Sequence, residues 1–251
     1  MSMSRTRKII YPLALFAAIL VIWQVAVTVL AVPSYLMPSP VGLANYFVAY
    51  LQSGTLVANT WSTLQEVIIG TYWGILLGVV LGYLIAKIHV LERLLMPLVL
   101  VLQVAPKISL APLFVLWFGL GIGSKVALVI LVVSFPVMLT ECDALKGIDH
   151  NHQDLMTILG ASRWQRFSKL EVPLIFASIM TGVKVSLTQA MTGAVIGEMI
   201  GAKSGLGYLL TYGNEMYDIN IILSSVIMLS IIGLVLYYLA EIIEKKVLFW
   251  M

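Results

Sequence analysis

Long apolar runs, separated by short polar segments, repeat along almost the whole chain. The runs are continuous and lack the alternation of apolar and polar residues that is typical of half-buried strands. Most of them exceed the ~18–20 residues that a helix needs to cross a lipid bilayer. Inside a bilayer the backbone groups must form hydrogen bonds within their own element, so such runs predict membrane-spanning helices. The predicted spans, about six, are residues 9–31, 62–88, 91–118, 124–145, 172–200 and 221–247.

Two of these runs depart from a simple span. The third contains Pro106 and Pro112, and each proline removes a backbone donor and kinks or splits a helix. The fifth would reach about 43 Å as a continuous helix, whereas the hydrocarbon core of a bilayer is about 30 Å thick. Gly193, Gly197 and Gly201 fall near its end. We therefore expect a break in the third span and a bend or break late in the fifth.

Composition strengthens the membrane assignment. Of 251 residues, 61% are hydrophobic and only 11% are charged, whereas a soluble domain is about 25% charged. We predict an all-α, polytopic integral membrane protein whose single transmembrane domain covers residues 1–251. The first apolar run is longer than the ~7–15 residues of a signal-peptide core, so we expect it to be a retained span. With Cys142 as its single cysteine, the chain has no internal disulfide.

The basic residues set the predicted orientation, because cytoplasmic segments near spans carry an excess of Lys and Arg. With the N-terminus inside, 11 of the 15 basic residues fall on inner segments, whereas the outer segment 32–61 has none. These inner residues are Arg5, Arg7, Lys8, Lys87, Arg93, Lys146, Arg163, Arg166, Lys169, Lys245 and Lys246. Both termini are therefore expected in the cytoplasm, together with the loop at about residues 146–171.

That inner loop carries an island of charge, "ILGASRWQRFSKLEVP", at residues 158–173. The preceding "NHQDLMTIL" predicts a short amphipathic helix, which Gly160 would end. Ser162 can cap a second helix that starts at Arg163, and Pro173 suits the start of the next span. The pattern predicts a platform of two short helices that offers apolar side chains to a partner. The alternative is a basic loop that lies on anionic lipid.

The loop resembles the signature of the permease subunits of bacterial ABC importers, which reads E-A-A, three residues, G, nine residues, I-x-L-P. Aligning Gly160 with the family glycine places Pro173 on the family proline. The E-A-A positions are then held by Asp154, Leu155 and Met156, and the I and L positions by Leu170 and Val172. The departure is a shorter acid and two side chains larger than alanine.

Three further segments are similar to the nitrate, taurine, aliphatic sulfonate and pyrimidine-precursor subgroup of these permeases. They are "LMPSPVGLANYF", "APKISLAPLFVLWFGLG" and "GEMIGAKSGLGYLL". The resemblance implies a bacterial inner-membrane protein that carries a small solute and pairs with a second permease copy, as a homodimer. It also implies two cytoplasmic ABC ATP-binding subunits, which bind the ATP and Mg, and an extracytoplasmic substrate-binding protein. Membrane lipid is a further expected partner and nucleic acid is not.

In that family the inner loop is the coupling helix, which docks on the ATPase. The resemblance assigns this docking role to Asp154, Leu155, Met156, Leu159, Gly160, Ala161, Ser162, Arg163 and Pro173. The chain itself would carry no catalytic residue, cofactor or metal. His150 and His152 lack the i, i+4 spacing that metal ligands on a helix prefer.

Ionisable residues at membrane depth cost about 2.5–3.5 kcal/mol each, so they usually face a cavity or a partner. Together with two glutamines they are our candidates for the translocation pathway: Glu66, Gln103, Lys107, Lys184, Gln189 and Glu198. The structural alternative is that the glutamates satisfy backbone groups or pair with lysines, and that Lys107 caps a helix end.

Other classes of protein fit less well. A secondary transporter or channel driven by an ion gradient is the main alternative, and such proteins often show inverted repeats and paired broken spans. The sequence shows no repeat, and this class gives the inner platform no purpose. A membrane-embedded enzyme would need His, Asp or Glu clustered at one membrane face. A scaffold without a transport role does not explain the charges within the spans.

Overall fold

The computed structural model describes the backbone of residues 5–247 and, within that range, the side chains of residues 10–12 and 14–246. Helices are the regular structure throughout this part of the chain, as the all-α prediction requires. In order they are α1 (Arg5–Val29), α2 (Pro40–Gln52), α3 (Thr55–Lys87), α4 (His89–Val104), α5 (Lys107–Phe118), α6 (Ile122–Lys146), α7 (His150–Ile158), α8 (Arg163–Arg166), the π-helix η1 (Phe167–Glu171), α9 (Val172–Met199), α10 (Leu206–Glu215) and α11 (Ile219–Val247).

Five helical stretches are long and apolar enough to cross a membrane. They are α1, α3, α6, the continuous stretch Arg163–Met199 and α11. The pair α4 and α5 is bent by 105° and adds a sixth span if the two helices count as one. The prediction of about six spans agrees with this arrangement.

The break predicted in the third span occurs at the first proline. Helix α4 ends at Val104, and Pro106 is the N-cap of α5, where its missing N–H costs little. Helix α5 continues through Pro112, so the break expected in this span lies at Pro106 alone. Pro112 lies in the second turn of a short helix, where it forfeits a single hydrogen bond.

The helix of the fifth span ends at Met199, two residues before Gly201. Helix α9 runs without interruption through Gly193 and Gly197 and stops at Met199, just before Gly201 with φ +77°. A β-carbon on Gly197 would lie 3.0 Å from the Lys125 side chain of α6. The bend or break expected late in the fifth span therefore falls at Gly201, and Gly197 permits close packing of α9 against α6.

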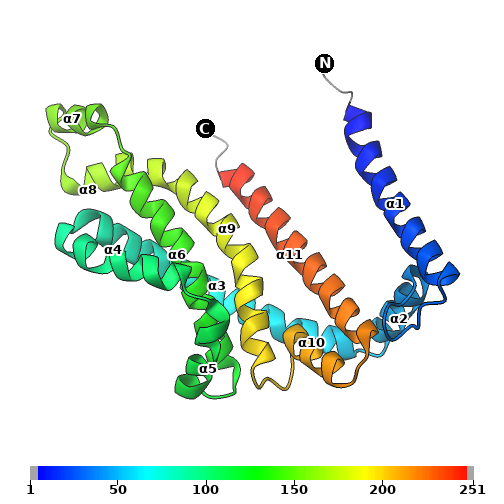
Figure 1. Cartoon of the computed structure of the whole chain (residues 1–251). Coiled ribbons are helices and arrows are strands. Elements are labelled where there is room, and N and C mark those ends of the chain that lie inside the picture. The colour runs from blue at the N-terminus through cyan, green and yellow to red at the C-terminus, as the bar shows by residue number, and fades with distance from the viewer. Residues whose placement is uncertain (1–4, 248–251) are drawn as a thin grey trace.

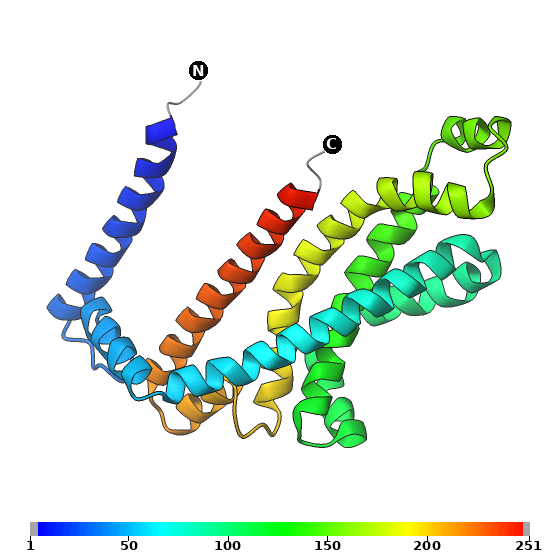
Figure 2. The ribbon, with the colours of Figure 1, turned by 180° about the vertical axis from the view of Figure 1, so that it is seen from behind.

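Helices α3 and α6 form the closest pair in the bundle. Glycines recur at every fourth position of α3 and so share one helix face: Gly70, Gly74, Gly78 and Gly82. A β-carbon on each would come within 2.5–2.8 Å of atoms of α6. Small residues allow the two backbones to approach and pack tightly inside a membrane. Figure 2 shows α3 crossing in front of α9 and α6.

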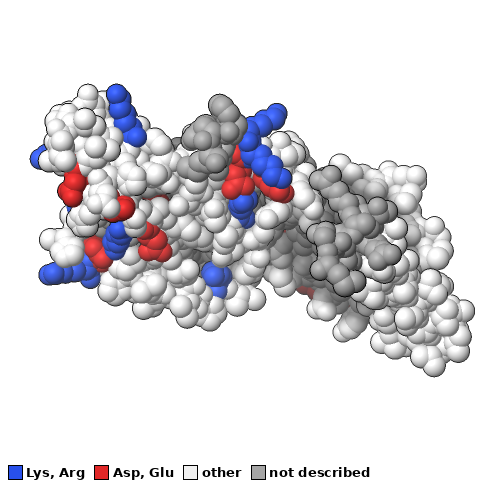
Figure 3. All heavy atoms as spheres, turned by 90° about the horizontal axis from the view of Figure 1, so that it is seen from above, with Lys and Arg blue, Asp and Glu red and all other residues white. Residues whose placement is uncertain are grey.

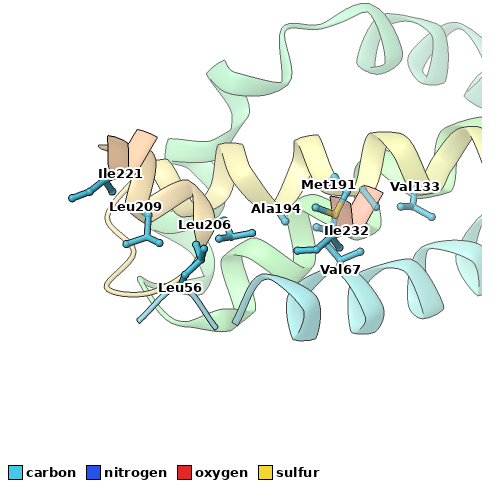
Figure 4. Close-up of a cluster of buried hydrophobic side chains, with 11 residues drawn as sticks. Leu56, Val67, Val133, Met191, Ala194, Leu206, Leu209, Ile221 and Ile232 are labelled. Carbon is cyan, nitrogen blue, oxygen red and sulfur yellow. The ribbon is translucent and has the colours of Figure 1, made fainter. Parts of the chain in front are cut away.

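The bundle has two distinct ends. In Figure 1 the start of α1, the end of α11 and the short helix α7 lie at the upper end, and α5, α10 and α2 lie at the lower end. Helix α1 stands apart at one edge. Figure 4 shows the main apolar cluster, in which Val67, Met191 and Ile232 from three different helices meet.

Candidate functional site

Helix α7 is built by local signals that the sequence carries. The Asp149 carboxylate caps it by accepting a hydrogen bond from the backbone N–H of Asn151 at 3.0 Å. This bond, with a second from the Asn151 side chain, holds the pKa of Asp149 below its ordinary value. Gly160 follows the helix with φ +66°, a conformation that favours glycine. The helix stop predicted at Gly160 is confirmed.

Helix α8 starts with a capping box. The Ser162 hydroxyl accepts from the backbone N–H of Gln165 at 3.3 Å, and the Gln165 side chain accepts from the Ser162 N–H at 2.8 Å. The cap predicted at Ser162 is confirmed. The second helix, however, turns into η1 and then α9 without a break, so the platform is continuous with a span. We call residues 149–171 the platform.

The platform exposes large apolar side chains. Leu155 is 53% exposed, Leu159 69% and Ile158 82%. Trp164, which the sequence analysis did not single out, is 71% exposed and lies on the adjacent α8. An indole beside basic residues is a typical interface anchor, and this signal could have found it in the sequence.

The remaining residues predicted to dock divide into three groups. Asp154, Gly160, Ser162 and Arg163 are exposed, whereas Ala161 and Pro173 are half-buried. Met156 does not face outward as expected, because it packs against an apolar cluster of its own chain. That cluster consists of Leu145, Ile148, Leu170 and Ile175. Met156 therefore anchors the platform to the bundle.

A polar link ties the platform to α3. Glu171 accepts from the Lys87 ammonium at 2.5 Å and from the Tyr83 hydroxyl at 3.1 Å. The Tyr83 ring also meets Phe167 of η1 edge-on, with 5.5 Å between ring centroids. The residues are separated by more than 80 positions, so no local pattern in the sequence indicates the pairing. Residues 167–171 form a π-helical turn. Such turns are rare in proteins, and many of those known lie at functional sites.

Charged side chains gather around this end of the molecule. Arg166 donates to the Thr157 hydroxyl at 2.8 Å and joins α8 to α7. Lys146 of α6 pairs with Glu92 of α4 at 2.6 Å. The view from above in Figure 3 shows basic and acidic side chains interspersed over the half that carries α4, α7 and α8 and over the end of α11.

At the opposite end of the bundle, the carboxyl group of Glu198 is buried. Glu198 is 1% exposed and accepts from the Thr63 hydroxyl at 2.7 Å and from the backbone N–H of Gly207 at 2.5 Å. The Thr63 hydroxyl in turn accepts from the backbone N–H of Leu206 at 2.8 Å. Glu198 and Thr63 thus hold the start of α10 against α3 and α9. We call Glu198, Thr63 and the N–H groups of residues 206 and 207 the latch.

Glu66 lies next to the latch. Its carboxyl is beside that of Glu198, and the residue is 5% exposed. It lines a cavity of about 300 Å³ together with Lys125 and Lys203. The Lys125 ammonium donates hydrogen bonds to backbone carbonyls of the loop before α6. The bond to the Gly121 carbonyl is 3.0 Å long. The alternative to a pathway role was that the glutamates accept hydrogen bonds from backbone groups. Glu198 does so from the N–H of Gly207.

The other predicted pathway residues lie apart from this pair. Lys184 of α9 pairs with Glu244 of α11 at 2.6 Å, and both side chains are largely buried. Lys107 donates to the carbonyl of Gln103 at 3.4 Å, across the α4–α5 break. Gln189 is half-buried on α9, one turn beyond Lys184. Glu66 and Glu198 therefore lie together, as do Gln103 and Lys107, whereas Lys184 and Gln189 lie elsewhere on α9.

The described part of the chain contains no group of three or more His, Cys, Asp or Glu arranged to hold a metal ion. Its polar clusters are instead hydrogen-bonded links between helices. Such links can transmit a movement from one helix to another, because breaking them exposes unpaired polar groups.

Comparison with known proteins is consistent with a transport role. Residues 74–249 match the family described as "Binding-protein-dependent transport system inner membrane component". The chain is 34% identical to the riboflavin transport system permease protein RibX of Chloroflexus aurantiacus, over 92% of this chain and 87% of the relative. It is 32% identical to the formylaminopyrimidine transport permease protein ThiX of Halalkalibacterium halodurans, over 99% and 98%.

A third relative is the putative aliphatic sulfonates transport permease protein SsuC of Bacillus subtilis, 29% identical over 95% of this chain and 86% of its own. In fold, the chain is similar to a solved structure of the inward-facing MetNI methionine ABC transporter, with a TM-score of 0.68 and 19% identity. That match covers 77% of this chain and 96% of the other. The chain therefore belongs to the binding-protein-dependent transport family and is a multi-pass permease subunit of an ABC importer.

Proposed function

We propose that the platform is the surface on which a cytoplasmic ABC ATP-binding subunit docks. The observation that carries this proposal is the set of exposed apolar side chains on Leu155, Ile158, Leu159 and Trp164. Trp164 lies on the stretch Arg163–Met199, which is continuous with a membrane-spanning helix, and the other three side chains lie on the adjoining α7 and its C-cap. An exposed apolar patch rimmed by charge is typical of a protein interface. The patch also distinguishes this role from that of a purely basic loop resting on lipid.

The assembly that we propose contains two copies of this chain, two ATP-binding subunits and an extracytoplasmic binding protein, within membrane lipid. ATP and Mg bind to the ATPase partner, and this chain supplies no catalytic group. The platform and both termini face the cytoplasm in this scheme. Lys87 and Lys146 are the last residues of α3 and α6, and Arg163 is the first residue of α8 in the platform. The side chains of Arg5, Arg7 and Lys8, which contributed to the predicted orientation, lie outside the described residues.

A route for mechanical coupling follows from the contacts of the platform. A displacement of α8 reaches α9 directly, because η1 joins the two helices. It reaches α3 through Glu171, which is bonded to both Lys87 and Tyr83. Helix α6 then follows α3, because the glycine-lined contact between them leaves no space for independent movement.

We propose that the transported solute is a small heterocycle rather than a small anion. Lys107 and Lys184 would suit an anion, yet Lys184 is paired with Glu244 and Lys107 donates to a backbone carbonyl. Two of the relatives named above are permeases for riboflavin and formylaminopyrimidine. Gln103 and Gln189 stay candidates for the pathway wall, with half-buried amides free to face a neutral solute.

The test is co-purification of this chain with the ATP-binding subunit encoded beside it. The double variant Ile158→Asp, Leu159→Asp should lose the ATPase while it keeps its membrane insertion and unfolding temperature. Tyr217→Asp is the matched control, because Tyr217 is 87% exposed at the opposite end of the bundle. Retention of the ATPase by the double variant would refute docking at the platform. Ion-driven flux by the purified chain alone would instead favour a secondary transporter.

A further inference from the structure

The turn between α10 and α11, residues 216–218, lies at the end of the bundle opposite the platform (Figure 1). Two backbone hydrogen bonds close this turn. The N–H of Tyr217 donates to the Asn214 carbonyl at 3.2 Å. The N–H of Asp218 donates to the Gly213 carbonyl at 2.9 Å. These are the two bonds of a Schellman motif, a common way for a helix to end.

Tyr217 occupies the position of this motif that glycine usually holds. Its φ is +53°, in the left-handed region. Glycine adopts this conformation without strain and asparagine tolerates it, whereas a bulky side chain costs free energy there. Among the described residues, the other non-glycine residue with a positive φ is Ala31, whose side chain is small. A strained residue of this kind points to a function for its side chain.

That function is not packing within the chain. Tyr217 is 87% exposed and the adjacent Met216 is 57% exposed. Asn214 and Glu215, which precede them, are exposed as well. We call residues 214–217 the tip. Because an ionised carboxylate is costly in the hydrocarbon core of a bilayer, the tip belongs in the aqueous phase, and its ring is positioned for a partner there.

The turn is also held in place from two sides. The Asp218 carboxylate accepts from the backbone N–H of Asn220, in the first turn of α11, at 2.9 Å. Its second oxygen accepts from the hydroxyl of Tyr46 on α2 at 3.4 Å. A tyrosine ring on such a preorganised turn offers a large contact area and loses little conformational entropy when a partner binds.

We propose that the tip is a docking point for the extracytoplasmic substrate-binding protein and that the Tyr217 ring is its anchor, a role that rests on the proposed function and orientation. The family of this chain is described as binding-protein-dependent. The ATP-binding subunits occupy the platform, so a partner on the other side of the membrane meets the opposite end of the bundle. The exposed Glu215 beside the ring favours a lysine or arginine of the partner at the rim of the contact.

The experiment is a titration of the purified binding protein, encoded beside this chain, against the importer in lipid nanodiscs. Surface plasmon resonance gives the affinity. Tyr217→Gly removes the ring, so the affinity should fall about tenfold or more, as expected for an interface anchor. Tyr217→Phe keeps the ring and should bind nearly as tightly as the wild type. Tyr72→Ala is the control and should not change the affinity, because Tyr72 is 64% exposed in the middle of the α3 span.

Thermal unfolding separates an anchor from a structural residue. Tyr217→Gly removes the left-handed strain, so its unfolding temperature should not fall while its affinity for the binding protein does. A fall in both quantities would assign the ring a structural role within the chain and would overturn the proposal.

A crosslink identifies what covers the ring. The single cysteine, Cys142, is buried, so Tyr217→Cys gives this chain one accessible thiol, which can carry a benzophenone. Irradiation in nanodiscs should link this position to the binding protein, whereas the same label on Tyr72→Cys should react with lipid. A label at position 217 that links only to lipid, or to a second copy of this chain, would contradict the proposal.

Absence of binding to the wild type, or wild-type affinity in Tyr217→Gly, would each overturn the assignment of the tip. Retention of the ATP-binding subunit is measured in the same preparations, so the two docking surfaces are tested separately. If the ATPase co-purifies and Tyr217→Gly binds as tightly as the wild type, the tip assignment alone is wrong. If Tyr217→Gly loses the binding protein and the double variant of Ile158 and Leu159 keeps the ATPase, the tip stands and docking at the platform falls.

Discussion

The two ends of the bundle differ in which side chains they expose and which they bury. At the platform end Ile158 is 82% exposed, and its charged neighbours form pairs near the surface. At the other end Glu198 is 1% exposed and is bonded to a hydroxyl and a backbone N–H. Exposed apolar groups cost free energy until a partner covers them, whereas a buried carboxyl is stabilised by hydrogen-bond donors of its own chain. The platform therefore has the features of an interface, and the latch those of a structural link.

Buried ionisable residues within the spans also differ in whether they have hydrogen-bond or ion-pair partners in their own chain. The rule that an ionisable residue within a span marks a functional site draws attention to Glu198 and Lys184. Both are engaged with their own chain, Glu198 in the latch and Lys184 with Glu244. Glu141 and Glu66, by contrast, each have a buried Oε2 without a hydrogen-bond partner among the described residues. Burial of an ionisable residue within a span therefore does not by itself mark a ligand site.

The largest expected effect comes from breaking the latch. Glu198→Ala leaves the buried Gly207 N–H without its acceptor and the Thr63 hydroxyl with only the Asn59 carbonyl, so we expect a loss of about 3 kcal/mol in the free energy of unfolding. Unfolding in mixed detergent micelles measures this change. Glu198→Gln should lose less, and Glu215→Ala is the exposed control. Wild-type stability of Glu198→Ala would show that the latch is not structural.

The platform should behave in the opposite way. Trp164→Ala removes an exposed indole, so the free energy of unfolding should change by no more than about 0.5 kcal/mol. Docking of the ATP-binding subunit should weaken about tenfold, as expected for an interface anchor. Titration of the purified ATPase against the permease in detergent measures the affinity. A destabilised variant with unchanged docking would reverse the roles that we assign to the two ends.

The link between platform and spans should show its effect in coupling. Glu171→Lys places two cations together at Lys87, so we expect several-fold less solute carried per ATP hydrolysed. The double variant Lys87→Glu, Glu171→Lys restores an opposite pair and should recover part of the coupling. The ratio of uptake to ATPase activity in liposomes gives the measurement. If the double variant is no better than the single one, the pair does not transmit movement.

The smallest effect concerns the cap of α7. Hydrogen bonds from Asn151 lower the pKa of Asp149, so the folded state binds this proton less readily than the unfolded state does. The cap therefore contributes fully above the unfolded pKa of about 3.9 and is lost as the pH falls through the lower folded value. Amide exchange in α7 should be insensitive to Asp149 ionisation from pH 5 to 8. Asp149→Ala should slightly increase the amide exchange rate in α7 over this whole pH range. Asp149→Asn should leave the rate unchanged, because asparagine can also cap a helix.

Local rules predicted much of this protein correctly. The apolar runs gave the all-α class and the spans, and Ser162 and Gly160 gave the boundaries of the platform helices, because caps and stops depend on a few adjacent residues. Helix α2 was missed although Ser39 and Pro40 provide an ordinary start signal. Helix α10 was also missed, since its start is fixed by contacts with Thr63 and Glu198 rather than by a cap of its own.

The sequence by itself determined that this chain crosses a membrane as helices, carries the two short helices of the platform and resembles importer permeases. Each of these conclusions rests on residues that are neighbours in the chain. Only the tertiary structure decided that Met156 packs inward, that Glu171 meets Lys87, and that Glu198 is engaged while Glu141 is not. These outcomes depend on which helix faces are in contact. Each contact joins residues far apart in the chain, and no local pattern encodes such separations.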